Sequence, residues 1–189
     1  MQTTSHFIGL KLKPELFSDL FMRLQRTLGD HTDALEFQNI LSVHITLFYL
    51  PQELTLHDEE KIRDIVQHLD VGSLKQGLQG FDYFGEPEAP RLCYLIPHTD
   101  KLADWNALLQ KTFPEYMNIP DNAHPMFIPH ITLFKIRNMS IFLSVRNALG
   151  NIIREELEKL AFADIFDHIG LFAVNSGFCP EIQVEIDVE

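Results

Sequence analysis

The pentapeptide His-Ile-Thr-Leu-Phe occurs twice in this chain of 189 residues, at positions 44–48 and 130–134. An identical repeat of this length is improbable by chance in so short a chain. In a β-strand, residues i and i+2 project from the same face. The repeat therefore predicts two strands, each with a histidine, a threonine and a phenylalanine on one face and aliphatic side chains on the other.

The predicted secondary structure repeats around these two strands. Its order is strand, helix, repeat strand, helix and two strands, followed by helix, repeat strand, helix and two strands. The expected strands cover residues 7–12, 41–50, 74–84, 91–97, 127–136, 162–172 and 178–187. The expected helices cover residues 14–28, 58–69, 101–113 and 140–160. This order predicts an internal duplication in which each half contributes one repeat strand. No linker or change of composition separates the halves, so we expect residues 1–189 to form one domain of two lobes.

The charge of the chain limits its partners. It has 15 Lys and Arg against 27 Asp and Glu, which gives a formal net charge of −12. Affinity for long nucleic acids comes mainly from cationic contacts with phosphates, so we expect no duplex DNA partner. A small anionic substrate or an RNA end is still compatible with a local cationic pocket.

We expect a monomeric, cytoplasmic protein that does not enter a membrane. No apolar run approaches the roughly 20 residues needed to span a bilayer. The first residues show no basic segment followed by an apolar one, as a signal peptide would. Cys93 and Cys179 form no CxxC motif, and we expect them to be reduced thiols.

The two histidines of the repeat suit general acid–base chemistry. Imidazole has a pKa of about 6.5, so near neutrality His44 and His130 can divide the roles of base and acid between them. One accepts a proton from an attacking water or hydroxyl and the other donates a proton to a departing oxygen, which suits phosphoryl transfer. The hydroxyls of Thr46 and Thr132 can donate to non-bridging phosphate oxygens.

The two phenylalanines have two interpretations. Phe48 and Phe134 can flank a nucleobase in a cleft between the lobes. They can equally pack in the core as ordinary strand residues. A single His-x-Thr strand is usually structural as well, and it is the second copy that favours catalysis.

No metal or cofactor is expected. His124 and His130, with Asp121 nearby, have no standard ligand spacing, and zinc needs three or four converging ligands. The chain contains no Walker loop, GxGxxG motif or GxSxG elbow.

The segments His-Ile-Thr-Leu at 44–47 and Pro-His-Ile-Thr-Leu at 129–133 resemble the paired H-x-T-L motifs of the 2H phosphoesterase superfamily. This superfamily includes RNA 2′,3′-cyclic phosphodiesterases and proteins similar to 2′-5′ RNA ligases. The resemblance covers nearly the whole chain, and the doubled motif is its specific part. It implies an α+β, bilobal fold with two pseudo-symmetric, mostly antiparallel sheets, helices outside and a central cleft.

The resemblance also implies an activity and a site. The activity is metal-independent hydrolysis of the 2′,3′-cyclic phosphate of a nucleotide or RNA end. The catalytic residues that it implies are His44, Thr46, His130 and Thr132. Bacterial sequences of the RNA ligase type often carry an arginine shortly after each motif. Here Phe48 and Tyr49 follow the first motif, and the second is followed by Lys135 and Arg137. Lys135 and Arg91 are the expected cationic contacts to the substrate, alongside the two phenylalanines.

Two other functions remain open. The same groups can serve 2′-5′ RNA ligation or the processing of an RNA end. A non-catalytic nucleotide-binding module would keep the pocket without turnover. The expected substrate has a cyclic phosphate or a 2′-5′ linkage. The repeat does not specify it further, because specificity lies in loops such as 85–90 and 114–125. The repeat also does not specify which histidine is the acid.

Overall fold

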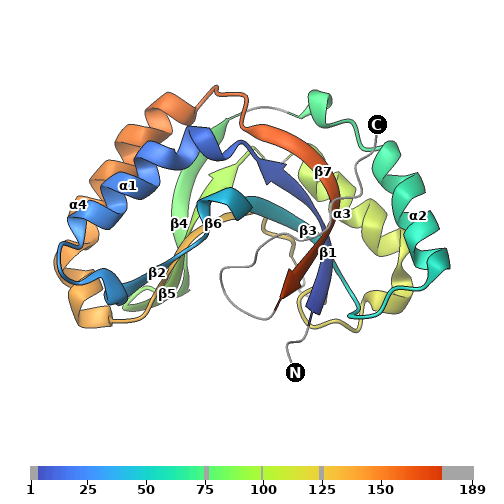
Figure 1. Cartoon of the computed structure of the whole chain (residues 1–189), viewed down its shortest axis with the longest axis horizontal. Coiled ribbons are helices and arrows are strands. Elements are labelled where there is room, and N and C mark those ends of the chain that lie inside the picture. Colours follow the sequence, from blue (N-terminus) through green and yellow to red (C-terminus); the bar gives the residue numbers. More distant parts are fainter. Residues whose placement is uncertain (1–3, 75–76, 99, 124–125, 176–189) are drawn as a thin grey trace.

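The structure is a computed structural model that describes residues 4–74, 77–98, 100–123 and 126–175. Within these residues the strands form two antiparallel sheets, one in the order β3-β1-β7 and one in the order β2-β6-β5-β4 (Figure 1). The strands are β1 (Thr4–Leu12), β2 (Leu35–Phe37), β3 (His44–Leu50), β4 (Leu78–Glu86), β5 (Ala89–Pro97), β6 (Ile131–Ile136) and β7 (Phe166–Asn175). The repeat strands β3 and β6 therefore lie in different sheets.

Helices cover the outer faces of both sheets. In the described ranges the α-helices are α1 (Ser18–Thr27), α2 (Leu56–Gln67), α3 (Asp100–Thr112) and α4 (Met139–Leu160). Helices α1 and α4 pack together beside β4, whereas α3 contacts β3 and α2 contacts β7. Figure 1 shows the helices as the outer layer of an arch and the strands as its inner layer. None of the helices in these ranges is long and apolar enough to cross a membrane.

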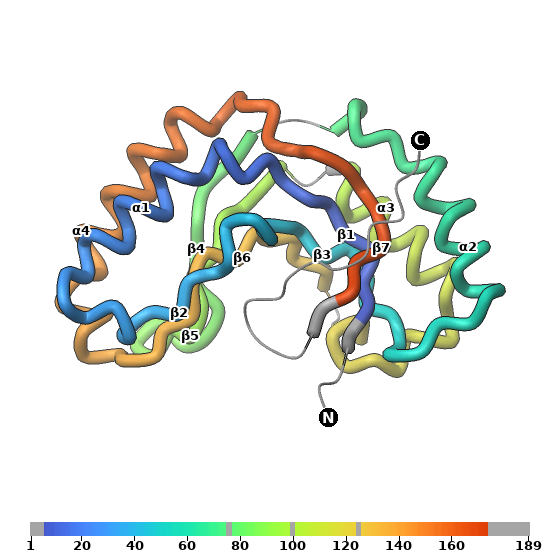
Figure 2. The backbone as a smooth tube through the Cα atoms, in the orientation of Figure 1, coloured from blue at the N-terminus to red at the C-terminus, as the bar shows by residue number. Residues whose placement is uncertain are grey.

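The chain crosses between the two lobes in the same way in each half. Helix α1 follows β1 and precedes β3 in sequence, yet it packs against α4 on the side of the other sheet. Helix α3 follows β5 and precedes β6, yet it packs against β3. The path is visible in Figure 2, where the blue and yellow-green segments each pass from one lobe to the other. The lobes are therefore interleaved along the sequence.

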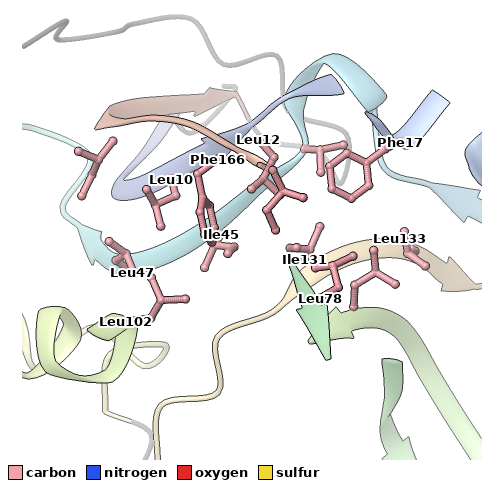
Figure 3. Packing of buried hydrophobic residues seen from close by; sticks show 14 of the residues in the cluster. Leu10, Leu12, Phe17, Ile45, Leu47, Leu78, Leu102, Ile131, Leu133 and Phe166 are labelled. Carbon is pink, nitrogen blue, oxygen red and sulfur yellow. The ribbon is translucent and has the colours of Figure 1, made fainter. Parts of the chain in front are cut away.

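The aliphatic residues of the two repeats share one core. Ile45 and Leu47 from β3 and Ile131 and Leu133 from β6 are at most 1% exposed and belong to a single buried cluster (Figure 3). Burying each such side chain contributes about 1.5–3 kcal/mol. This core joins the sheets directly and fixes the repeat strands relative to each other.

A β-bulge interrupts the first repeat strand. Gly9 of β1 pairs with Thr46 of β3. The preceding residue, Ile8, pairs with Phe48, so Leu47 is an extra residue without a partner in the ladder. An extra residue shifts the alternation of side chains by one position.

The second repeat strand has a bulge at the equivalent place. Tyr94 of β5 pairs with Thr132 of β6, and the preceding Cys93 pairs with Phe134. Leu133 is therefore the extra residue, as Leu47 is in β3. Both copies of the pentapeptide thus adopt the same irregular strand, and in both the residues after the bulge face opposite to the expected side.

The α+β class and the arrangement of two sheets with helices outside are confirmed, and the differences lie at the ends of elements. The first repeat strand begins at His44 because Ile40–Ser42 forms a 3₁₀ turn, which Asn39 caps by accepting from the N–H of Leu41 at 3.0 Å. The second begins at Ile131. Each histidine thus lies at the start of its strand, where the backbone enters the sheet.

Other boundaries differ for similar local reasons. The strand expected from residue 74 begins at Leu78, because Val71–Ser73 is another 3₁₀ turn. The expected turn at 85–90 is shorter, because β4 runs to Glu86 and β5 begins at Ala89. Strand β2 was not predicted, since three residues carry no periodic pattern. The strand expected at 178–187 lies outside the described residues.

Replacing Gly9 by alanine is expected to lower the free energy of unfolding by about 1–3 kcal/mol. An added Cβ would lie 2.6 Å from the carbonyl oxygen of Ile45 and 2.8 Å from the ring of Phe7, so the bulged pairing has no room for it. Urea unfolding measures the loss. Gly80→Ala on β4 is the matched control, because the nearest atom to its added Cβ is 3.9 Å away. Equal losses in the two variants would contradict this account of the bulge.

Candidate active site

His44 and His130 occupy equivalent positions in the two repeats. His44 is the first residue of β3, His130 immediately precedes β6, and these strands contact each other although they belong to different sheets. Both side chains are partly buried. The charge of His130 acts on the pKa of His44, so the two imidazoles lie within electrostatic reach of each other.

Both imidazoles are held through the same ring atom. Nδ1 of His44 lies 2.6 Å from the carbonyl oxygen of Ser42, and Nδ1 of His130 lies 2.9 Å from the carbonyl oxygen of Ile128. A carbonyl oxygen can only accept, so Nδ1 carries the proton in each ring. The Nε2 atom of each neutral ring then has a free lone pair, which is the tautomer that a general base at Nε2 requires.

Burial lowers the pKa of both imidazoles. For His44 burial is the largest cause, the hydrogen bond to the Ser42 carbonyl opposes it, and the charge of His130 lowers the pKa further. For His130 burial again lowers the pKa and the hydrogen bond to Ile128 opposes it. Since the usual value is about 6.5, both rings are mainly neutral at pH 7 in the unliganded protein. An anion bound beside them favours the protonated form and can convert one of them into an acid.

Aromatic side chains cause much of this burial. The ring of Phe7 stacks on His44 with centroids 4.8 Å apart. The rings of Phe84 and Tyr94 meet His130 edge-on, with centroids 5.0 Å and 5.6 Å away. These residues come from β1, β4 and β5, and no motif in the sequence marks them, because cross-strand pairing alone brings them to the histidines.

Thr46 and Thr132 each follow their histidine by two residues and are partly buried. Both precede the bulge, so the predicted alternation holds for them and each shares a strand face with its histidine. The hydroxyl of Thr46 is hydrogen-bonded to that of Tyr49. The four residues that the repeat singled out for catalysis thus lie at the start of two strands that contact each other.

The prediction that Phe48 and Phe134 face the cleft is wrong. Both are 0% exposed. Phe48 stacks on Phe113 with centroids 6.0 Å apart, and Phe134 meets Phe37 edge-on at 5.5 Å. The bulge is the physical reason, because it turns both rings from the histidine face into the core.

The same bulge brings the following residue, Tyr49 or Lys135, back to the histidine face. Tyr49 has its ring centroid 6.4 Å from that of Phe7. Burial raises the pKa of its hydroxyl, the hydrogen bond with Thr46 opposes this, and the charge of Asp121 raises the pKa further. Lys135 holds the equivalent position in β6 and is partly buried. Regular strand alternation therefore placed Phe48 on the histidine face of β3, where the structure has Tyr49.

A cavity of about 520 Å³ opens beside Thr46 and His130. Its volume falls within the range of about 300–1,000 Å³ that is typical of small-molecule sites. Tyr49 forms part of its wall, and Arg91 and Asp121 bring opposite charges to it. Arg91 was predicted as a substrate contact, and its exposed side chain borders this cavity. Three of the eight predicted site residues line this cavity, whereas five do not: His44, Thr132, Lys135, Phe48 and Phe134.

Two buried asparagines hold β3 where it borders the cavity. Asn122 pairs with the main chain of Tyr49 in both directions, since its Oδ1 accepts from the N–H at 2.8 Å and its Nδ2 donates to the carbonyl at 2.8 Å. Asn106 on α3 donates from Nδ2 to the carbonyl of the bulge residue Leu47 at 2.7 Å. Both asparagines also line the cavity. The sequence contains no signal for either residue, because they reach β3 from distant segments.

Metal ligands do not converge in the part of the chain that the structure describes. It contains no group of three or more His, Cys, Asp or Glu side chains arranged to hold a metal ion. Asp121 borders the cavity, and His124 lies outside the described residues.

The chain is similar to several solved protein structures. No protein-family model matches the chain, and no curated protein matches its sequence. The structure of ATU0111, a conserved protein of unknown function from Agrobacterium tumefaciens, matches 98% of this chain and 87% of its own, with TM-score 0.54 and 16% identity. TT0787 of Thermus thermophilus matches with TM-score 0.51 and 19% identity over 72% of this chain and 75% of its own. Usb1 of Kluyveromyces marxianus matches with TM-score 0.50 and 14% identity over 90% and 93%. At these identities the matches show a shared fold, which agrees with the expected architecture of two sheets with helices outside.

The free energy of unfolding is expected to decrease as the pH falls below about 6.5, because of the two histidines. Their pKa values are lowered in the folded state, so below this pH the unfolded chain binds more protons than the native protein does. Chemical denaturation between about pH 7 and 5.5 measures the slope, and a double His44→Asn, His130→Asn variant should lose part of it. His57→Asn, at an exposed position on α2, controls for the loss of an imidazole. An unchanged slope in the double variant would contradict the account.

Proposed function

We propose that this chain is a phosphodiesterase that hydrolyses the 2′,3′-cyclic phosphate of nucleotides or RNA ends by two-histidine acid–base catalysis. One observation carries the proposal. Two imidazoles within electrostatic reach are each held at Nδ1 by the carbonyl two residues earlier, and each is followed by a threonine on the same strand face. The fold that the chain shares with Usb1 and the two bacterial proteins is compatible with this assignment.

The proposed reaction is an in-line displacement at phosphorus. Nε2 of one neutral imidazole accepts a proton from water while the water oxygen forms its bond to phosphorus. The bond from phosphorus to the ribose 3′-oxygen breaks, and this oxygen takes a proton from Nε2 of the other, protonated imidazole. The product is a 2′-phosphate with a free 3′-hydroxyl, and the two rings end with their protons exchanged, so solvent resets them.

The lowered pKa values fit this reaction in a specific way. In the unliganded protein both rings are mainly neutral, which supplies the base directly. The acid must gain its proton when the substrate binds, because the negative charge of the phosphodiester raises the pKa of an adjacent imidazole. The hydroxyls of Thr46 and Thr132 donate to the non-bridging oxygens and stabilise the charge that develops on them.

The cavity beside Thr46 and His130 is the proposed site of the nucleoside. Its volume admits a base and ribose, and the ring of Tyr49 offers a stacking surface in place of the buried Phe48. Arg91 borders the cavity and is a proposed phosphate contact. Lys135 is a further proposed contact, because it holds the position in β6 that Tyr49 holds in β3.

Purified protein is expected to hydrolyse 2′,3′-cyclic nucleotides in the presence of EDTA. His44→Ala and His130→Ala should each lower kcat by about 10²–10⁴-fold, which is the usual contribution of a general acid or base. Product analysis by ³¹P NMR identifies the 2′-phosphate. His57→Ala, at an exposed position on α2, is the control.

Three outcomes would count against this function. Full activity in either active-site variant would exclude the two-histidine mechanism. Tight binding of a cyclic nucleotide without turnover would favour a nucleotide-binding module. Joining or cleavage of 2′-5′ linkages, with no activity on cyclic phosphates, would favour the processing of RNA ends.

A comparison of alanine variants at Phe48 and Tyr49 tests which ring forms the stacking surface. Tyr49→Ala is expected to raise KM about tenfold with a smaller effect on stability, because one stacked base contributes about 1–3 kcal/mol. Phe48→Ala is expected to lower the free energy of unfolding by about 3–5 kcal/mol, because its ring is fully buried. Steady-state kinetics and urea unfolding of both variants give the comparison. A larger KM effect for Phe48→Ala than for Tyr49→Ala, in folded protein, would show that the assignment is wrong.

A further inference from the structure

Gln38 directly follows β2, the short strand that pairs with β6, and it is 5% exposed. Its main-chain N–H donates to the carbonyl oxygen of Leu133 at 2.8 Å. Its side-chain Nε2 donates to the carbonyl oxygen of Ser42 at 3.2 Å. One buried residue therefore joins the second repeat strand to the segment that precedes the first.

Both acceptors belong to the catalytic framework. Leu133 is the bulge residue of β6 and the sequence neighbour of Thr132. The carbonyl of Ser42 is the group that holds Nδ1 of His44 at 2.6 Å. This carbonyl accepts from both His44 and Gln38, which uses its two lone pairs. A carbonyl held from two sides cannot rotate without losing one of the bonds.

We propose that Gln38 is a positioning residue that couples the two halves of the site. Its main chain holds the bulge beside Thr132, and its side chain fixes the Ser42 carbonyl that orients the ring of His44. Gln38 does not touch the substrate and acts through these groups. The kinetic consequences rest on the phosphodiesterase function proposed above, whereas the coupling to the imidazole is a property of the unliganded protein.

The bulge in the first repeat strand is held by a side chain from α3. The carbonyl of Leu47 accepts from Nδ2 of Asn106 at 2.7 Å, and Oδ1 of Asn106 accepts from Gln110 at 2.9 Å. That chain of hydrogen bonds leads back into α3. The two bulges are alike in geometry, but the donor at the second one, Gln38, also reaches the partner of a catalytic imidazole.

The side chain of Gln38 has a specific electrostatic effect on His44. A donor that binds the Ser42 carbonyl draws electron density from it and makes it a weaker acceptor for the Nδ1–H group. Without that donor the carbonyl stabilises the imidazolium more strongly, so the pKa of His44 should rise. Among the described residues, Lys11 of β1 pairs with His44 of β3, and the charge of His130 acts on the pKa of His44. A change at Gln38 leaves both in place.

Gln38→Met tests the coupling, because it removes the side-chain donor, keeps a similar length and retains the main-chain N–H. NMR titration of the imidazole signals without substrate should show a higher pKa for His44 and an unchanged pKa for His130. In the kinetic assay, kcat should fall about 10–100-fold with little change in KM, as is typical when a supporting hydrogen bond is lost. Ile153→Val, a fully buried position on α4, reports what a small loss of stability alone does to these quantities.

Gln38→Glu is the conservative variant and carries the test if Gln38→Met fails to fold. Burial raises the pKa of such a carboxyl, so it stays protonated and donates to Ser42 while His44 titrates. This variant should therefore restore the titration of His44 to nearly that of the native protein. Unchanged titration of His44 in Gln38→Met, equal shifts of both histidines, or a shift in Gln38→Glu as large as that in Gln38→Met would overturn the proposal. Absence of turnover in the native protein would overturn the phosphodiesterase function alone, because the titration needs no substrate.

Discussion

A β-bulge in both copies of the pentapeptide decides which of their side chains face the core and which face the histidines. At Leu47 and at Leu133 one residue is left outside the ladder, and the side chains that follow change face. Histidine and threonine precede each bulge and stay on the open face. Phe48 and Phe134 follow it and complete the core. A regular strand would expose the rings or bury the hydroxyls, so the bulge makes five consecutive residues serve packing and chemistry at once.

The imidazoles of both repeats lie in apolar surroundings that favour their neutral form. Rings from β1, β4 and β5 contact them, and the local carbonyls restore only part of what burial removes. Both rings are therefore neutral bases in the unliganded protein. In the function proposed above, the negative charge of the bound phosphate would raise the pKa of one ring and so convert it into the acid.

The order of the expected elements, together with the resemblance of the repeat to the H-x-T-L motifs, was sufficient to predict the α+β class, and the repeat singled out four candidate site residues. Alternation with a period of two holds for the strand faces of His44, Thr46, His130 and Thr132, because all four precede the bulges. It failed for Phe48 and Phe134, since a bulge is set by cross-strand pairing and leaves no trace in periodicity. Phe7, Asn122 and Gln38 could not be predicted for a related reason. Each reaches the site through tertiary contacts. None of them belongs to a motif or a periodic pattern, so the sequence does not mark them.

In the proposed function, two imidazoles that belong to different sheets face one phosphate. A titration of the unliganded protein with a nucleoside 2′-monophosphate, the expected product, tests this arrangement when the imidazole C–H signals of both histidines are followed by NMR. The arrangement predicts that both signals move with a single binding constant and that the pKa values of both rings rise in the complex. Movement of one histidine alone, or of neither at saturating nucleotide, would contradict it.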